Sequence, residues 1–471
     1  MFRVALCSLF GIVVMSGGCG GGSGAGGTGG GGTSGTGGAG GDGVGGVTGS
    51  GGTNGAGGAG GTSATGGSGA LAPPSAFTLV APLQGSSAQP LTPDLQWNAA
   101  DGATSYTVEV ATAATFGVTD VVNQFVGGTA TDFTIPASTL EAGVIYFWRV
   151  TAVNGGGSTV ATAASLWFSS PYLISGAHGI AVTPDGTRLV VASDINNGPI
   201  DVVTIATRAI TSVGTGVPSQ PMGVALSPDG TQALATLLTN GNGGVNGVAV
   251  IDLTTNTLTG TIADPCVGTT LGDVAYFPSG TEAAIPDLSS GCAAMGLSTF
   301  TPNLGSPNFM FVNFGDTNDP DGVAISPNGA FALVTMALDD RLYQVTFPGT
   351  VSHLSLSSTS SGVAITPDGT KAVVAEATAD VITLASGSIA PVALMNNDTP
   401  NLDFHNVAIT PDGTEAVVVG VGSVQVISLT SNTVVASYPA DGGTSVAISP
   451  DGTTAFVTDM ADGWVRVLQM P

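Results

Sequence analysis

The sequence contains very few basic side chains. Its 471 residues include only 7 lysines and arginines against 32 aspartates and glutamates, which gives a formal net charge of −25. Nucleic-acid backbones and anionic lipid surfaces both attract clusters of cations. The composition therefore excludes nucleic acid as a partner and disfavours direct binding to a membrane surface. It disfavours phosphorylated substrates for the same reason.

Motifs of catalysis and of metal binding are also scarce. The sequence has no HExxH zinc motif and no CxxCH haem motif, and residues 73–471 contain no GxSxG nucleophile motif. We therefore expect no cofactor, and a non-catalytic protein is the first interpretation.

The first 18 residues resemble the signal peptide of a bacterial lipoprotein. The apolar run Val4–Met15 is too short to span a bilayer. Small residues then lead to Cys19, where this family attaches lipid and begins the mature chain. The resemblance implies lipidation of Cys19, although Ser16 stands where the family has Leu, Ile or Val, and ordinary signal cleavage is the alternative. Gly20 in place of aspartate implies the outer membrane.

Residues 19–72 consist mainly of glycine with serine, threonine and alanine. Such a segment has no side chains whose burial could offset the backbone entropy lost on ordering. We expect a disordered tether that would span roughly 40 Å on average. It would hold the following domains away from a membrane that the chain contacts only through its lipid.

Residues 73–170 show the alternating pattern of a small β-sandwich. Strand-like runs, separated by Asp, Gly or Asn turns, occur at 94–98, 105–111, 132–135 and 144–153. Trp97 and Tyr146 resemble the core tryptophan and the tyrosine corner of a fibronectin type III domain. The sequence has no RGD loop, so a spacer is the first interpretation and an adhesive role stays open.

One phrase occurs seven times in residues 171–471. It joins a short apolar strand, a turn close to Pro-Asp-Gly-Thr, and a second apolar strand. The copies begin at Gly179, Gly223, Asp273, Gly322, Gly362, Asn406 and Ser445. Proline and glycine supply the backbone conformations of a tight turn, so each copy predicts a β-hairpin.

The spacing of the copies predicts a closed ring. All-strand repeats roughly 40–50 residues apart are typical of β-propellers with four strands in each blade. Seven copies predict seven blades, each packing against the next. The last copy is one strand short at the C-terminus, and Ser170–Ser175 is available to supply the missing outer strand and remove the free edge.

The phrases resemble the YVTN family of β-propeller repeats, within the lactonase-like seven-bladed group. The Pro-Asp-Gly-Thr turn is the closer match, and Phe456–Asp459 matches the YVTN tetrapeptide loosely. The expected fold class is all-β, with a disordered Gly-rich linker, a fibronectin type III-like β-sandwich and a seven-bladed β-propeller. That group includes binding proteins, lactonases and lyases, so the resemblance implies the fold more specifically than the function.

Four residues are candidates for a ligand site at the mouth of the central channel. The residue before each inner strand should face that mouth, and His178, His405 and Asp321 occupy this position, with Asp273 beside it. Such residues suit a polar ligand, but they can equally hydrogen-bond a neighbouring blade. We assign none of them to catalysis or to a metal.

Two segments leave calcium open as a cofactor. Asp316–Asp321 and Asn396–His405 are rich in oxygen donors, which calcium prefers, but neither has the spacing of an EF-hand. Polar turns are the simpler interpretation.

Two cysteines flank the third hairpin. Cys266 and Cys292 lie in a chain that we expect to be exported, where such pairs usually form disulfides. A disulfide between them is therefore expected.

These features favour an exported, monomeric lipoprotein at the outer membrane, whose propeller binds an unidentified protein or small molecule. An extracytoplasmic lactonase-like or lyase-like enzyme with a site at the channel mouth is the alternative, and a structural envelope protein is the third possibility. A mouth where His178 and His405 converge on one acid would favour the enzyme. A closed mouth would favour binding on the outer faces of the blades, or a structural role.

Overall fold

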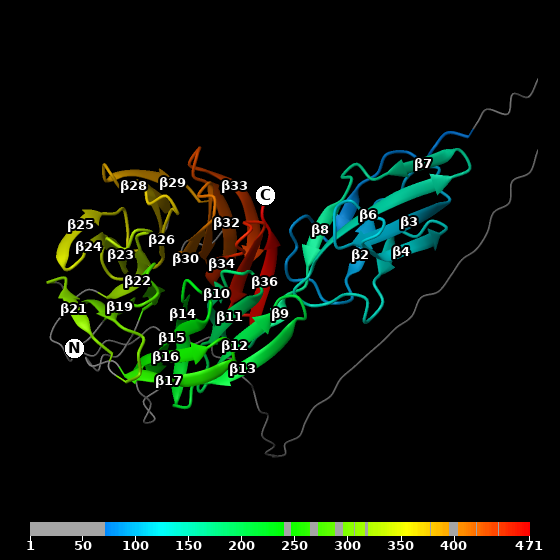
Figure 1. Cartoon of the computed structure of the whole chain (residues 1–471). Coiled ribbons are helices and arrows are strands. Elements are labelled where there is room, and N and C mark those ends of the chain that lie inside the picture. Colours follow the sequence, from blue (N-terminus) through cyan, green and yellow to red (C-terminus); the bar gives the residue numbers. More distant parts are fainter. Residues whose placement is uncertain are drawn as a thin grey trace, which may run out of the picture. The chain divides into compact units, whose positions relative to one another are not determined.

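The structure is a computed structural model of the chain (Figure 1). It describes residues 71–239, 246–263, 272–287, 295–305, 307–315, 319–376, 378–394, 404–420, 422–440 and 442–471, with residues 404 and 405 described by their backbone only. These residues fall in one compact unit, and their regular elements are all β-strands. No helix among them is long and apolar enough to span a bilayer. The predicted signal peptide, the lipidation site and residues 19–70 of the predicted tether lie outside the described residues.

The first described segment forms two antiparallel sheets. One sheet has the strand order β1-β2-β5, and the other has the order β4-β3-β6-β7 with β8 paired to β6. Their strands are β1 (Leu79–Ala81), β2 (Asp94–Trp97), β3 (Ser105–Ala111), β4 (Asp120–Gly127), β5 (Asp132–Thr134), β6 (Ile145–Asn154), β7 (Gly157–Val160) and β8 (Leu166–Ser169).

The core of this segment follows from the alternation seen in the sequence. Every second side chain of β6 is buried, as expected for a strand with one face in a core. Trp97 and Trp148 are almost fully buried. The hydroxyl oxygen of Tyr146 accepts a hydrogen bond from the backbone N–H of Glu141 at 2.9 Å, which joins β6 to the turn before it.

Seven antiparallel sheets of four strands follow, numbered here in chain order. Sheet 1 contains β10 (Ala177–Val182), β11 (Arg188–Ser193), β12 (Pro199–Thr204) and β13 (Ala209–Gly214); sheet 2 contains β14 (Ser219–Leu226), β15 (Gln232–Thr239), β16 (Gly247–Asp252) and β17 (Thr257–Ala263); sheet 3 contains β18 (Ala275–Tyr276), β19 (Ala283–Asp287), β20 (Gly296–Phe300) and β21 (Met310–Asn313).

The remaining four sheets have the same order. Sheet 4 contains β22 (Pro320–Ile325), β23 (Phe331–Met336), β24 (Arg341–Thr346) and β25 (Thr350–Ser355); sheet 5 contains β26 (Val363–Ile365), β27 (Lys371–Ala375), β28 (Ala379–Thr383) and β29 (Ser388–Val392); sheet 6 contains β30 (Phe404–Ile409), β31 (Glu415–Gly420), β32 (Gly422–Ser428) and β33 (Thr433–Ala440); sheet 7 contains β34 (Gly443–Ile448), β35 (Thr454–Asp459), β36 (Trp464–Gln469) and β9 (Tyr172–Leu173).

The outer strand of sheet 7 comes from the start of the repeat region. In β9, Leu173 pairs with Trp464 and Tyr172 pairs with Val465 of β36. This is the segment that the sequence offered for the missing strand. The pairing covers the free edge of the last sheet and joins the two ends of the repeat region.

The repeated phrase builds the hairpin between the first two strands of each sheet. In sheet 1 the Thr183 hydroxyl donates to the Asp185 carboxylate at 2.6 Å, which also accepts the backbone N–H of Thr187 at 3.0 Å. These bonds favour the ionised carboxylate and lower the pKa of Asp185 to about 2. Gly186 then turns the chain at a φ of +70°, which glycine adopts without strain. The same Ser or Thr to Asp or Asn bond occurs in sheets 2, 4, 5, 6 and 7.

The seven turns also lie against one another in chain order. A Cβ atom placed on Gly230 would lie 3.0 Å from Pro184 of the turn before it. One placed on Gly186, in the first turn, would lie 3.4 Å from Pro450 in the last. The turns of sheets 1 and 7 are therefore neighbours, as are those of sheets 1 and 2.

Candidate functional site

The inner strands approach one another so closely that several positions admit only glycine. A Cβ atom on Gly179 would lie 2.1 Å from the carbonyl oxygen of Met222 in the next sheet. On Gly272 it would lie 2.0 Å from the carbonyl oxygen of Asp321, and on Gly322 it would lie 2.1 Å from that of Ser361. Real Cβ contacts are never this short, so these glycines set the packing at the centre of the ring.

Threonines of the second strands hold neighbouring inner strands in register. In sheet 4 the Thr335 hydroxyl accepts the backbone N–H of Gly322 at 2.8 Å and donates to the carbonyl of Ser361 in sheet 5 at 2.6 Å. In sheet 7 the Thr458 hydroxyl donates to the carbonyl of His178 in sheet 1 at 2.5 Å. Sheets 7 and 1 are thus linked by the same kind of bond as sheets 4 and 5.

Two of the predicted site residues lie together at the centre. The backbone N–H of Asp273 in sheet 3 donates to the carbonyl of Asp321 in sheet 4 at 2.9 Å. Burial, reinforced by the charge of Asp321, raises the pKa of Asp273 to about 7. Burial also raises the pKa of Asp321 to about 6, although the Ser361 hydroxyl opposes this shift. Near neutral pH the pair therefore carries fewer than two negative charges.

A side chain from a distant sheet reaches this pair. Asn406 of sheet 6 places its Nδ2 atom 3.5 Å from Oδ2 of Asp273 and 3.2 Å from the hydroxyl oxygen of Ser445 in sheet 7. The inner strand of sheet 6 packs against those of sheets 5 and 7, and the inner strand of sheet 3 against those of sheets 2 and 4, so this contact spans the centre of the ring. Side chains of the protein itself occupy the middle of the channel at this level.

Among the described residues, no contact is seen between the predicted histidines and the two acids. Burial lowers the pKa of His178, although the charge of Asp194 and a hydrogen bond to the backbone of Met222 oppose the shift. The backbone carbonyl of His178 accepts a hydrogen bond from the Thr458 hydroxyl of sheet 7. Its contacts therefore link neighbouring sheets, and its Nδ1 atom has no hydrogen-bond partner among the described residues. The side chain of His405 lies outside the described residues.

The remaining predicted sites fall largely outside the described residues. Cys266 and Cys292, with their expected disulfide, lie outside them, and so do residues 316–318 and 396–403 of the two oxygen-rich segments. Within the described ranges, no three His, Cys, Asp or Glu side chains are grouped to hold a metal.

Sequence reasoning missed a second acidic pair, in sheet 5. The Glu376 carboxylate accepts the hydroxyls of Ser357 and Ser358 at 2.8 and 2.9 Å. Burial, with the neighbouring charge of Asp380, raises the pKa of Glu376 to about 7. Burial raises the pKa of Asp380 as well. One proton shared between the two carboxyls would relieve their repulsion.

Glu376 directly follows the second strand of sheet 5, and Asp380 lies on the third strand. The register between these strands shows that the same two positions hold polar pairs in other sheets. In sheet 7 it holds Asp459 and Arg466, which form a buried ion pair at 2.7 Å. In sheet 3 it holds Asp287 and Ser298, joined at 2.9 Å. Aligning the residues that follow the second strand of each copy would have shown this signal.

The comparisons with known proteins agree with this architecture. No protein-family model matches the chain, and no curated protein matches it. Among solved structures, hydrazine synthase from Kuenenia stuttgartiensis is 19% identical with a TM-score of 0.54, covering 63% of this chain and 96% of that one. The Swd1 β-propeller domain from Myceliophteria thermophila is 9% identical with a TM-score of 0.53, covering 64% and 99%.

This chain contains a β-propeller. At these identities the likeness shows the fold alone, and the propeller fold supports many unrelated activities. The centre of the propeller has two features that bear on function: a pair of acids with raised pKa values, and an amide that spans the channel beside them.

Proposed function

We propose that this chain is an exported lipoprotein, lipidated at Cys19 and anchored at the outer membrane, whose seven-bladed propeller binds a protein or small-molecule partner. Residues 19–72 serve as a flexible tether, and the fibronectin type III-like domain serves as a spacer. The protein acts as a monomer, and nucleic acid is not a partner because the chain carries a net charge of −25.

Several observations support the parts of this proposal. Seven four-stranded sheets, with β9 completing the last, support seven blades. The buried Trp97 and the bond from Glu141 to Tyr146 support a fibronectin type III-like domain. The repeated turn bonds support a YVTN-type repeat. The apolar run Val4–Met15 ahead of Cys19 supports export and lipidation.

The contact between Asn406 and Asp273 is the observation that favours a binding role over an enzymatic one. It places protein side chains across the centre of the channel, where a propeller enzyme would need to admit its substrate. Binding on the outer surfaces of the blades needs no such opening. The geometry therefore favours a scaffold whose partner docks outside the channel.

Lipidation is tested in cells that produce the full chain and are fed a clickable palmitate analogue. The parent chain should incorporate the label and fractionate with the outer membrane. Cys19→Ser should lose both properties, whereas Cys7→Ser, a control within the signal peptide, should keep them. Label that persists in Cys19→Ser would contradict the anchoring part of the proposal.

Binding is tested by photo-crosslinking of the full chain on intact cells, followed by titration with the purified partner. A saturable complex that survives Asp273→Asn would support a scaffold whose binding surface lies outside the channel. A complex that is lost in that variant would place the partner at the channel instead.

An enzyme remains the second candidate because of the raised pKa of Asp273. A carboxyl that titrates near neutral pH suits general acid–base chemistry. Turnover of a panel of lactones by the full chain, with a pH profile inflecting near 7 and abolished by Asp273→Asn, would support it. The scaffold proposal expects no turnover in either protein.

A further inference from the structure

The turn of sheet 3 differs from the six others. They place Ser or Thr before the proline and Asp or Asn after it, whereas sheet 3 has Phe277 and Ser279 at these positions. Phe277 has no hydroxyl with which to hold the turn. Its ring packs instead against Phe347 of sheet 4, with the ring centroids 4.9 Å apart. Sheet 3 therefore has a buried aromatic contact with sheet 4 where the other copies have a hydrogen bond within the turn.

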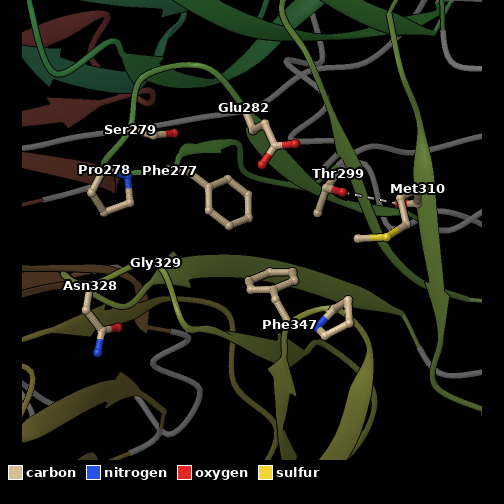
Figure 2. Close-up of a pocket in the computed structure, with 10 residues that line it drawn as sticks. Phe277, Pro278, Ser279, Glu282, Thr299, Met310, Asn328, Gly329 and Phe347 are labelled. Atoms are coloured by element: carbon tan, nitrogen blue, oxygen red, sulfur yellow. Dashed lines mark hydrogen bonds between the residues drawn. The ribbon is translucent and has the colours of Figure 1, made fainter.

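These two rings line a groove between sheets 3 and 4 (Figure 2). Its volume is about 420 Å³. Met310, a residue that is 40% exposed, extends the apolar lining. Glu282, which is exposed, borders the same space and supplies a carboxylate. The groove combines aromatic and aliphatic surface with one negative charge.

Cations occupy the position of Glu282 in two other sheets. Arg188 of sheet 1 donates to the backbone carbonyl of Leu253 in sheet 2. Lys371 of sheet 5 donates through Nζ to the backbone carbonyl of Leu429 in sheet 6 at 2.5 Å. In both cases a long basic side chain crosses to the next sheet and donates a hydrogen bond to its backbone.

The residue of sheet 4 that corresponds to these acceptors is Phe347. Its N–H donates to the carbonyl of Ala330 in the turn, just as Leu253 donates to Thr231. Between sheets 3 and 4, a carboxylate therefore stands where a cation stands between sheets 1 and 2 and between sheets 5 and 6. A carboxylate cannot donate to a carbonyl, and the groove lies at this place.

We propose that this groove binds an extended segment of a partner protein in which an arginine or lysine stands beside an apolar residue, an inference that rests on the proposed scaffold function. The cation pairs with Glu282 and lies against the ring of Phe347, which is half-buried and is held in place by the buried Phe277. It takes the place that Arg188 and Lys371 take in their own sheets. The apolar neighbour covers Met310. The net charge of −25 favours approach of a basic partner.

The groove is tested by calorimetric titration of the full chain with acetyl-Phe-Arg-Leu-amide. The neutral control peptide carries citrulline, which keeps the shape of arginine without its charge. The parent should bind the arginine peptide at least tenfold more tightly than the citrulline peptide. Glu282→Gln should lose this preference. Glu415→Gln, which changes the carboxylate at the same repeat position in sheet 6, should keep it.

A double variant separates loss of the groove from loss of the fold. Phe277→Ser with Ser279→Asp restores the turn residues of the other six copies. Because Phe277 is buried against Phe347, the double variant should melt at a lower temperature than the parent, but it should keep the far-UV circular dichroism of the parent and lose the peptide. Equal binding by this double variant and the parent would overturn the proposal, and so would equal affinity for the two peptides. A failed titration alongside an intact complex on cells would reject the groove and leave the scaffold function standing. Failure of both would reject both.

Discussion

Sheets 3 and 5 are built from the same phrase but use it differently. In sheet 5 the Thr366 hydroxyl donates to Asp368 at 2.6 Å, and Lys371 reaches the next sheet. Sheet 3 has Phe277 and Glu282 at the corresponding places and borders a groove. The hairpin backbone is nevertheless the same, since the bond between the paired strand ends is 2.9 Å in both. The turn side chains can therefore change without loss of the hairpin, as they do in sheet 3.

The centre of the ring allows no such freedom, even in sheet 3. Gly272 lies as close to its neighbouring carbonyl as Gly179 and Gly322 do in the regular sheets. The same sheet thus varies at its turn and stays fixed at its inner strand. Close packing around the axis limits which residues the inner strand can carry. The exposed part of the turn has no such limit.

The largest expected effect is at this fixed end. Gly272→Ala would place a Cβ 2.0 Å from the carbonyl oxygen of Asp321, and the inner strands would have to separate. We expect a loss of about 3 kcal/mol in the free energy of unfolding, measured by urea denaturation. Gly214→Ala is the control, because a Cβ there has no atom within 4 Å. Equal stability of the two variants would remove the distinction between centre and rim.

The next effect is the pH dependence conferred by Asp273. Its carboxyl has a pKa of about 7 in the folded chain and about 4 when unfolded. Between these values the folded chain holds a proton that the unfolded chain releases, so the free energy of unfolding falls as pH rises. Asp273→Asn should remove on the order of 2 kcal/mol of this fall between about pH 4 and pH 7.

Asp185→Asn serves as the control for the pH experiment. The Asp185 carboxyl has a lowered pKa of about 2, so its contribution to stability changes below this window. Unfolding curves of Asp273→Asn and the parent that fall in parallel from pH 4 to pH 7 would contradict the raised pKa.

The smallest effects compare the two turns directly. Thr366 is buried, and its hydroxyl also accepts the N–H of Lys371 at 3.0 Å. Thr366→Val should therefore cost about 1–2 kcal/mol in the free energy of unfolding. Ser279→Ala in sheet 3, where the side chain is exposed, should cost about 0.5 kcal/mol or less. If the second loss matched the first, the turn of sheet 3 would be as tightly bonded as the others.

Most of the fold could be predicted from the repeated phrase, because the interactions that form its hairpin are local. Proline, glycine and a hydroxyl-to-carboxylate bond act within a few residues, so the hairpin at Thr183 and Asp185 is readable from the sequence. The strand at Tyr172 was predictable because the last copy was visibly one strand short.

The sites were less predictable because they depend on distances across the ring. The contact of Asn406 with Asp273 requires knowing how narrow the centre is, which no local pattern reports. The groove requires knowing that Phe347 faces Phe277 from the next sheet. Its sequence signal was nevertheless present, since Phe277 breaks the Ser or Thr pattern of the other copies.

The most direct test asks whether the chain itself can fill the open position of sheet 3. Glu282→Lys places a basic side chain where Arg188 and Lys371 already cross to the next sheet. Urea denaturation of the full chain should show this variant more stable than the parent by about 0.5–1 kcal/mol. Glu282→Gln, which removes the charge but cannot reach the next sheet as lysine does, is the control and should gain less. A variant that is no more stable than the parent would contradict the claim that a cation belongs between sheets 3 and 4.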